Sequence, residues 1–347
     1  MDCTYSIIVP VYNRPDEVRE LLESLTAQTR KDFEVVIVED GSTTDCRAVA
    51  ESFAGRLDLK YFAKKNSGPG LSRNYGAERA RGEWLIVLDS DVVLPCGYLE
   101  AVSDELRRAP ADAFGGPDRA HDSFTDTQKA ISYSMTSFFT TGGIRGGKKK
   151  LDKFYPRSFN MGVRRDAYLR LGGFSPMRFG EDIDFSIRIF KAGLSCRLFP
   201  GAWVWHKRRT DFRKFFRQVY NSGIARVNLY KKYPESLKAV HLLPAAFTLG
   251  VIALVLTSAA GRLLMHYDDL HRWYWLCAGP WLPILAYCAL IAADSAARNR
   301  SLKIGLLSVG AAFVQLMGYG LGFIAAWWKR CVMGKDEFSA FGDTFYK

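Results

Sequence analysis

Two carboxylates that follow one predicted strand are the first candidates for chemistry. The apolar run Trp84–Leu88 stops at Asp89, and Asp91 follows after one intervening residue, Ser90. Such a run is typical of a buried strand of a parallel sheet, and open α/β sheets bind ligands at the carboxyl ends of their strands. Carboxylate oxygens suit Mg²⁺ or Mn²⁺ and leave metal positions free for phosphate oxygens. The pair therefore predicts a divalent-cation site; the alternative is a strand that ends in a solvated turn.

A second acidic pair and one histidine extend the candidate site. Glu181 and Asp182 stand at the start of a predicted helix, so Asp182 is either an ordinary N-terminal cap or a general base. His206 precedes a basic run. A lone histidine is usually structural, but beside the acids at 89 and 91 it becomes a third candidate metal ligand.

Strands that alternate with helices must position these groups. The sequence predicts strands at 6–11, 33–38 and 59–62 with helical segments between them. This alternation indicates an α/β fold with a doubly wound, mostly parallel sheet. The glycines at 68 and 70 lack the spacing of a dinucleotide-binding loop, so we exclude a Rossmann cofactor.

Basic residues add candidates for phosphate binding. Segment 140–150 combines four glycines with three successive lysines, Lys148 among them, and is either a solvated loop or a lid that closes over phosphates. Arg209 lies in the basic run after His206 and is a second candidate for the phosphate or acceptor side of the site. The net charge is +12, but the basic residues cluster beside apolar stretches. Anionic lipid is therefore the expected partner, rather than nucleic acid.

Three apolar stretches predict a membrane region. Residues 242–261, 273–293 and 304–328 each approach the roughly 20 residues that span a bilayer. Lys and Arg in the loop between the second and third stretches predict that this loop and the domain before the stretches lie in the cytoplasm. Three spans would then place the tail 331–347 outside. The scattered cysteines, with no C-x-x-C pair, are expected of thiols in a reducing compartment.

The segment between the two regions has helical periodicity. Aromatic and apolar residues recur among basic ones over 211–232. This pattern predicts an amphipathic helix at the lipid surface, and a core-packed helix is the alternative.

Five motifs occur in an order that is typical of one family. They are Ser6-Ile-Ile-Val-Pro-Val-Tyr-Asn13, Val38-Glu-Asp-Gly-Ser42, Gly70-Leu-Ser-Arg-Asn74, Leu88-Asp-Ser-Asp91 and Gly180-Glu-Asp182. With them the chain resembles family 2 glycosyltransferases of the GT-A fold over about residues 4–230. The resemblance implies one α/β catalytic domain, placed here at 1–232, ahead of a helical membrane region at 240–330. It also implies a nucleotide-diphosphate sugar donor, a requirement for Mg²⁺ or Mn²⁺, and inversion at the transferred sugar.

The resemblance assigns a role to each matching position. Asp182 would be the catalytic base and Asp91 a metal ligand, with Asp89 facing the ribose or a metal-bound water. Asp40 would contact the base of the nucleotide, and Glu39 stands where many members have Asp. The remaining nucleotide-sugar positions are Pro10, Tyr12, Asn13, Arg73 and Ser90, and Glu181 would lie near the acceptor.

The basic and apolar segments after Trp205 resemble those of membrane-anchored transferases that build bacterial exopolysaccharides. We therefore expect a hexosyl- or N-acetylhexosaminyl-transferase of the cytoplasmic membrane, acting on a polyprenyl-phosphate-linked or growing glycan acceptor. The chain lacks the Gln-x-x-Arg-Trp sequence of processive synthases. A sugar nucleotidyltransferase would show a glycine-rich basic loop near the N-terminus, which is absent. The alternative left open is an assembly subunit with an inactive transferase domain, and the oligomeric state stays open as well.

Overall fold

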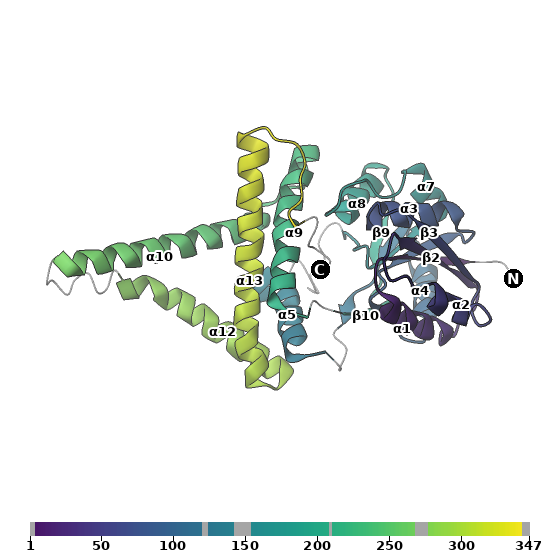
Figure 1. The fold of residues 1–347 in the computed structure, drawn as a ribbon, viewed down its shortest axis with the longest axis horizontal. Helices are drawn as coiled ribbons and strands as arrows, with labels where there is room; N and C mark the ends of the chain where they lie inside the picture. The colour runs from purple at the N-terminus through teal and green to yellow at the C-terminus, as the bar shows by residue number, and fades with distance from the viewer. Residues whose placement is uncertain (1–3, 120–123, 142–153, 208–209, 268–276, 342–347) are drawn as a thin grey trace. The chain divides into compact units, whose positions relative to one another are not determined.

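The chain forms two compact units. The computed structural model describes residues 4–119, 124–141, 154–207, 210–267 and 277–341. The first unit comprises 1–122 and 150–207, and the second comprises 123–149 and 208–347 (Figure 1). The chain therefore enters the second unit twice, because segment 123–149 leaves the first unit between two of its strands.

A seven-stranded sheet lies at the centre of the first unit, in the order β3-β2-β1-β4-β8-β6-β9. Strands β1 to β4 are mutually parallel, β8 runs antiparallel to β4 and β6, and β9 is parallel to β6. The prediction of a mostly parallel α/β sheet is thus confirmed. The strands are β1 Tyr5–Val11, β2 Phe33–Asp40, β3 Leu59–Lys64, β4 Trp84–Leu88, β6 Ala113–Gly115, β8 Asn160–Arg164 and β9 Cys196–Leu198.

Helices cover both faces of this sheet (Figure 1). Successive residues of a strand point to opposite faces, so Ile7 joins one core with α1, α2 and α4, while Ile8 joins the other with α3, α7 and α8. Both isoleucines are fully buried. The helices are α1 Pro15–Thr26, α2 Arg47–Phe53, α3 Pro69–Arg79, α4 Tyr98–Arg108, α7 Arg165–Arg170 and α8 Glu181–Lys191.

A small second sheet brings the histidine to the acid pair. It has the order β5-β10-β7, with β5 Val92–Val93, β7 Asp118–Arg119 and β10 Val204–His206. Strand β10 runs antiparallel to β5 and aligns His206 with Val92, the residue that follows Asp91. Pairing between strands far apart in the sequence therefore decides where the imidazole lies.

The second unit is helical. Its helices are α5 Asp126–Thr136, α6 Phe138–Thr141, α9 Phe212–Lys232, α10 Leu243–Tyr267, α12 Leu282–Asn299 and α13 Leu302–Trp327, with short helices at Pro234–Ser236, Ala239–His241, Gly279–Trp281 and Trp328–Val332. Three helical segments are long and apolar enough to cross a membrane: Ala239–Leu264, Gly279–Asn299 and Leu302–Val332. The second of these ends later than the predicted 273–293, because the helix continues past Asp294 to Asn299, and positions 273–276 of the prediction lie outside the described residues.

Helix α9 packs against α13 and α5. Phe215 and Val219 of α9 share an apolar cluster with Ile304 and Ala311 of α13 and with Ile131 of α5. These positions are buried in protein, as in the core-packed alternative for 211–232.

Candidate functional site

The predicted site residues gather at the carboxyl edge of the large sheet. Strands β2 and β4 end there with Asp40 and Leu88, and the acid pair follows β4 directly. Strand β8 runs in the opposite direction and begins at Asn160, which lies opposite Leu88. Residues just before β8 therefore reach the same edge. This explains how segments far apart in the sequence contribute to one site.

Asp89, Asp91 and His206 form a cluster with the donor atoms of a metal site. One ligand atom from each residue lies within 4.8 Å of the other two. Asp91 Oδ1 is 3.3 Å from His206 Nε2. Neighbouring ligands of a six-coordinate ion with bonds of about 2.1 Å lie about 3 Å apart, and opposite ligands about 4.2 Å. Two carboxylates and an imidazole at this spacing fit a divalent ion such as Mn²⁺ or Mg²⁺.

Neighbouring groups fix the orientation of these ligands. The His206 ring stacks on Phe159, with the ring centroids 4.6 Å apart. Its Nδ1 atom is buried and has no hydrogen-bond partner among the described residues. Arg14 Nη1 lies 3.0 Å from the other carboxylate oxygen of Asp91, Oδ2. One oxygen of Asp91 thus meets a fixed cation and the other faces the imidazole.

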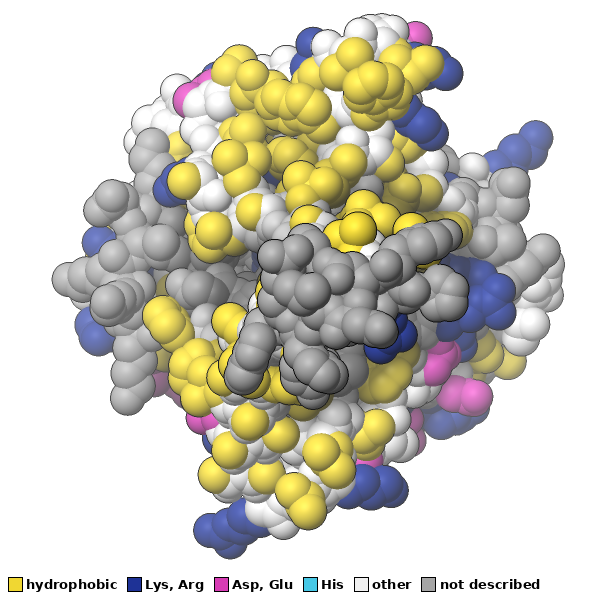
Figure 2. All heavy atoms as spheres, turned by 90° about the vertical axis from the view of Figure 1, so that its left-hand side faces the viewer, with side chains coloured by type: hydrophobic (Ala, Val, Ile, Leu, Met, Phe, Trp, Pro, Cys, Tyr) yellow, Lys and Arg dark blue, Asp and Glu magenta, His cyan; other side chains and the backbone are white. Residues whose placement is uncertain are grey.

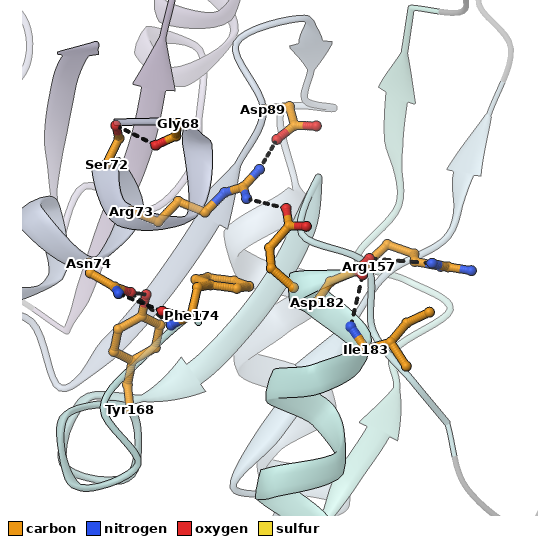
Figure 3. A network of polar contacts seen from close by, with 11 residues as sticks. Gly68, Ser72, Arg73, Asn74, Asp89, Arg157, Tyr168, Phe174, Asp182 and Ile183 are labelled. Atoms are coloured by element: carbon orange, nitrogen blue, oxygen red, sulfur yellow. Dashed lines mark hydrogen bonds and ion pairs between the residues drawn. The ribbon is translucent and has the colours of Figure 1, made fainter. Parts of the chain in front are cut away.

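Arg73 connects the two acidic pairs (Figure 3). Its side chain is only 3% exposed. Nη2 donates to Asp89 Oδ1 at 2.7 Å, and Nη1 donates to Glu181 Oε1 at 3.1 Å. A buried guanidinium keeps its charge and carries donors in a fixed planar fork, so it holds both carboxylates at a defined separation. The N-terminus of α8 is thereby tied to the end of β4.

Asp182 lies at the start of α8 with one arginine partner. Its Oδ1 accepts from the backbone N–H of Ile183 at 2.8 Å, and its Oδ2 lies 3.4 Å from Arg157 Nη1 (Figure 3). Gly180 precedes the helix with φ +85°, a left-handed conformation that suits glycine. Asp182 itself is mostly buried, at 8% exposure. The carboxylate therefore lies at a helix N-terminus, where a negative charge is favoured.

The surroundings of Glu181 change the pKa of its carboxyl group. Burial and then the charge of Asp182 raise the pKa of the Glu181 carboxyl above its usual range, and Arg73 partly offsets this by lowering it. The acidic pair at the start of α8 thus holds a proton more readily than two separate carboxylates would.

Hydrogen bonds to Asn13 and Glu39 hold the loops that follow β1 and β2, beside the site. Asn13 has φ +54°, and its Oδ1 accepts from the backbone N–H groups of Thr43 and Thr44 at 2.8 and 2.9 Å. Glu39, which is 2% exposed, accepts from the backbone N–H of Cys46 at 2.8 Å. The longer Glu side chain, in place of the family's common Asp, therefore holds the loop after β2 from within.

The carboxylate of Asp40 is held by the loop that leads into α3. It accepts from the backbone N–H groups of Ser67 and Gly68, both at 2.9 Å, and pairs with Lys64. These bonds orient the loop before α3, and contact of Asp40 with a nucleotide base stays a prediction.

The other predicted residues divide into placed and undescribed positions. Pro10 lies in β1 opposite Val38, Tyr12 follows the end of β1, and Ser90 is buried between the two acids. Their position at the edge agrees with the predicted pocket, although their contact with a nucleotide stays a prediction. Lys148 and Arg209 lie outside the described residues.

Comparison with known proteins identifies the domain that carries this edge. Residues 6–172 match the family described as Glycosyl transferase family 2. The chain contains a family 2 glycosyltransferase domain. The matched range holds both strands that end in acids, together with Arg73, whereas the acids of α8 lie beyond its end at residue 172.

Several curated proteins resemble the glycosyltransferase domain over part of their length. An uncharacterized glycosyltransferase of Haemophilus influenzae is 31% identical over 193 residues, which cover 54% of this chain and 62% of that protein. One of Rickettsia felis is 32% identical over 139 residues, 40% of this chain and 23% of that protein. The poly(ribitol-phosphate) beta-N-acetylglucosaminyltransferase TarS of Staphylococcus aureus is 38% identical over 91 residues, 25% of this chain and 16% of TarS. The chain spans less than two thirds of each of these relatives.

A solved structure shares the fold over most of both chains. It is the mannosyltransferase PcManGT of Pyrobaculum calidifontis, solved in complex with GDP-Man and Mn²⁺. It aligns with a TM-score of 0.60 over 90% of this chain and 87% of the other, at 19% identity. The GT-A-like fold that the motifs implied is confirmed.

The glycosyltransferase domain also uses residues that the sequence interpretation did not select. Arg14 pairs with Asp91, Arg157 pairs with Asp182, and Phe159 supports His206. Arg14 directly follows the first motif and could have been noticed there. Arg157 and Phe159 belong to no motif, and only the antiparallel insertion of β8 brings them to this edge.

Proposed function

We propose that this chain is a membrane-anchored inverting glycosyltransferase. It would transfer a hexosyl or N-acetylhexosaminyl group from a nucleotide-diphosphate sugar to a hydroxyl of a polyprenyl-phosphate-linked or growing glycan. The observation that carries this proposal is the cluster of Asp89, Asp91 and His206, linked through Arg73 to the acids of α8. A metal held at this edge beside a candidate base would supply the charge neutralisation and the proton transfer that this reaction uses.

The donor side of the site would be built around this cluster. Asp89, Asp91 and His206 would hold Mg²⁺ or Mn²⁺, which when bound offsets the negative charge of the diphosphate leaving group. Arg73 keeps Asp89 in place and is too deeply buried to act as a mobile phosphate ligand. Pro10, Tyr12, Asn13, Asp40 and Ser90 would form the nucleotide-sugar pocket along the same edge.

The acceptor side would depend on Asp182. Its carboxylate would accept the proton of the acceptor hydroxyl as that oxygen attacks from the face opposite the leaving diphosphate. The N–H of Ile183 and the Arg157 guanidinium hold the carboxylate in place. Glu181 would stay beside it, held by its hydrogen bond from Arg73.

The donor is best sought among sugars named for the relatives. TarS is named for the transfer of N-acetylglucosamine, and PcManGT was solved with GDP-Man and Mn²⁺. We therefore select UDP-GlcNAc and GDP-mannose as the first donors to test, each with Mn²⁺ and with Mg²⁺.

The test uses the full chain in lipid nanodiscs with a polyprenyl-phosphate-linked sugar acceptor. We expect one donor to release its nucleoside diphosphate only when metal is present, and the labelled sugar to extract into organic solvent with the lipid. The matched control for D182N is D166N, which alters a carboxylate that is 58% exposed. Binding of a donor without any release or transfer would contradict the proposal and favour the inactive assembly subunit.

A further inference from the structure

The three helices that could cross a membrane differ in what surrounds them. Within each apolar window, 11% of the residues of the first and second helices are buried in protein, compared with 39% for the third. Leu249 and Leu256 of α10 and Leu285 of α12 are more than half exposed. The third helix, α13, shares apolar clusters with neighbouring helices near both of its ends.

Helix α13 lies along α9 from one end to the other. Near its start, Ile304 and Ala311 pack with Phe215 and Val219, and near its end Phe323 packs with Ile224. The backbones approach closely between these contacts. A carbon added at Gly223 of α9 would lie 2.2 Å from the carbonyl oxygen of Tyr319. Because the two helices are packed together along their length, α9 must lie at the same depth in a membrane as α13.

Helix α9 is too polar to share a bilayer crossing. Arg217 and Arg226 lie in its middle, and further basic residues lie toward its two ends: Arg213, Lys214, Lys231 and Lys232. A charged side chain at the centre of a membrane helix costs about 2.5 to 3.5 kcal/mol on insertion scales. The cost for several such residues exceeds what packing against α13 would return.

Chain length places α9 and α5 on the side of the catalytic unit. Six residue steps separate Arg119 of β7 from Thr125, which caps α5. They reach at most about 20 Å, less than the roughly 30 Å of a hydrocarbon core. Helix α9 begins at Phe212, also six steps after His206 of β10. Helix α13 packs on both helices, and its Lys303 pairs with Asp126 of α5 at 2.8 Å.

The chain after α13 turns back along α9. Asn221 Nδ2 donates to the carbonyl of Ala340 at 3.0 Å, and its Oδ1 accepts from the Ala340 N–H at 2.8 Å. Asn228 donates to the carbonyl of Phe338 at 3.1 Å. The order of these contacts shows that the tail runs antiparallel to α9. It therefore lies on the same side of a membrane as that helix.

Helices α10 and α12 have the properties of a spanning pair. The first turns of α10 contact the middle of α13, where Thr248 of α10 donates to the carbonyl of Leu316 at 3.5 Å. The last turns of α12 contact the first turns of α13, where the hydroxyls of Ser295 and Ser308 are 2.7 Å apart. The parts of α10 and α12 beyond these contacts project from α13 as two arms (Figure 1). The 25 residues of the whole of α10 and the 21 residues of the helical segment Gly279–Asn299 correspond to about 37 and 31 Å, comparable to the roughly 30 Å of a hydrocarbon core.

The surface around the base of these arms suits the membrane interface. Hydrophobic side chains gather on this face, with Lys and Arg side chains toward its upper and lower margins (Figure 2). The ends of α13 contribute Leu302, Leu306 and Trp328, which are 60 to 70% exposed. Tryptophan and basic residues at the edge of an apolar surface are typical of helices that lie at a lipid headgroup layer.

We propose that α10 and α12 cross the bilayer as a hairpin, whereas α13 stays on the side of the catalytic unit and lies along the membrane surface. The C-terminal tail then shares that side, in place of the opposite side that three crossings imply. The partner of this surface is a lipid bilayer. The proposal concerns membrane insertion and is independent of the sugar transfer proposed above.

The test measures the sidedness of thiols in the full chain, expressed in a bacterial host. Cys96 is exposed in the catalytic unit and serves as the native reference. The variant E337C places a thiol at an exposed tail position, and H271C places one between α10 and α12. A membrane-impermeant maleimide is applied to right-side-out spheroplasts and to inverted vesicles, and mass spectrometry maps the labelled residues.

We expect the E337C thiol and Cys96 to label in the same preparation and the H271C thiol in the other. Labelling of E337C together with H271C would show a third crossing and overturn the proposal. Labelling of all three thiols in one preparation would show that the hairpin does not cross, and would overturn it equally. Sugar transfer enters none of these readouts, so a failed donor assay leaves the outcome unaffected.

A second measurement tests the attachment of the tail. N221L removes both hydrogen bonds to Ala340, whereas S222A removes only a local bond from Ser222 to the carbonyl of Gln218. We expect N221L to speed proteolysis of the tail in vesicles that expose it, and S222A to leave the rate unchanged. Equal rates in N221L and the parent would contradict a tail held on α9.

Discussion

The acidic pairs at 89 and 91 and at 181 and 182 occupy one edge of the sheet and share one arginine, yet their surroundings differ. The first pair meets an imidazole, and the side chain of Asp89 is 33% exposed. The second is buried at a helix N-terminus with arginines as its partners. The difference teaches that neighbours separate the roles of chemically equal carboxylates: convergent donors favour a metal, and a single fixed carboxylate favours proton transfer.

The largest expected effect is on turnover in D182N. The amide keeps the shape of the side chain but cannot accept the proton, so we expect a loss of about 10²- to 10⁴-fold in turnover. Donor affinity should stay unchanged, because the metal cluster is intact. Single-turnover transfer and calorimetric donor binding measure the two quantities. Parent-like turnover in D182N, with D166N as the control, would remove Asp182 from the base role.

D91N should produce the opposite pattern. Replacing the carboxylate that faces both His206 and Arg14 removes an anionic ligand, so nucleotide binding should lose its dependence on Mn²⁺. Calorimetry with nucleoside diphosphate, with and without Mn²⁺, measures the change. If D91N still binds nucleotide in a metal-dependent way, Asp91 is not a ligand, and the proposed contrast between the two pairs disappears.

H206D should change the choice of metal more than the ability to bind it. Imidazole suits transition metals, whereas Mg²⁺ prefers oxygen ligands. We expect the parent to prefer Mn²⁺ over Mg²⁺ by about 10-fold or more, and H206D to reduce this preference by about the same factor. Titrations of metal-dependent nucleotide binding give both constants. An unchanged ratio would leave His206 with a structural role on Phe159.

The smallest effects concern stability, where two glutamates should respond to pH in opposite directions. Burial tends to raise the pKa of Glu34, but hydrogen bonds from Ser6, Arg81 and Lys60 outweigh it and lower the pKa to about 2. Its contribution to stability is therefore present above the ordinary value of 4.5 and lost as the pH falls toward 2. The pKa of Glu181 is raised, so its effect is a loss of stability as the pH rises above 4.5.

Melting temperatures between pH 3 and pH 8 would separate these contributions. E34Q should cost about 1 to 2 kcal/mol at neutral pH and flatten the acid side of the curve. E181Q should reduce the loss of stability that the parent shows as the pH rises above 4.5. An acid limb in E34Q that matches the parent would show that Glu34 is not the titrating group.

The sequence was sufficient for the parts of the site that are determined locally. The run that ends at Leu88 is a buried strand, and the acids after it lie at the predicted edge. A continuous apolar run and a motif with fixed spacing both report short-range structure. For the same reason, α8 begins at Glu181, in the acidic pair where the sequence predicts the start of a helix.

Long-range packing determined what the sequence could not provide. Arg157 and Phe159 reach the site because β8 inserts antiparallel beside β4, and no local pattern records that pairing. The hydrophobic periodicity of 211–232 fits a lipid face and a protein face equally well. Only the contacts with Ile304 and Ala311 distinguish the two.

Segment 123–149 belongs to the second unit although it lies within the sequence of the first, and this affects how the protein can evolve. Ala130 and Ile131 of α5 are fully buried in the second unit, although β7 and β8 on either side of the segment belong to the first. If the chain were divided at any single point to separate the two units, α5 would lose its packing partners in the second unit. Recombination could exchange such an anchor only together with an internal piece of the enzyme, so the catalytic and membrane parts are expected to evolve as one module.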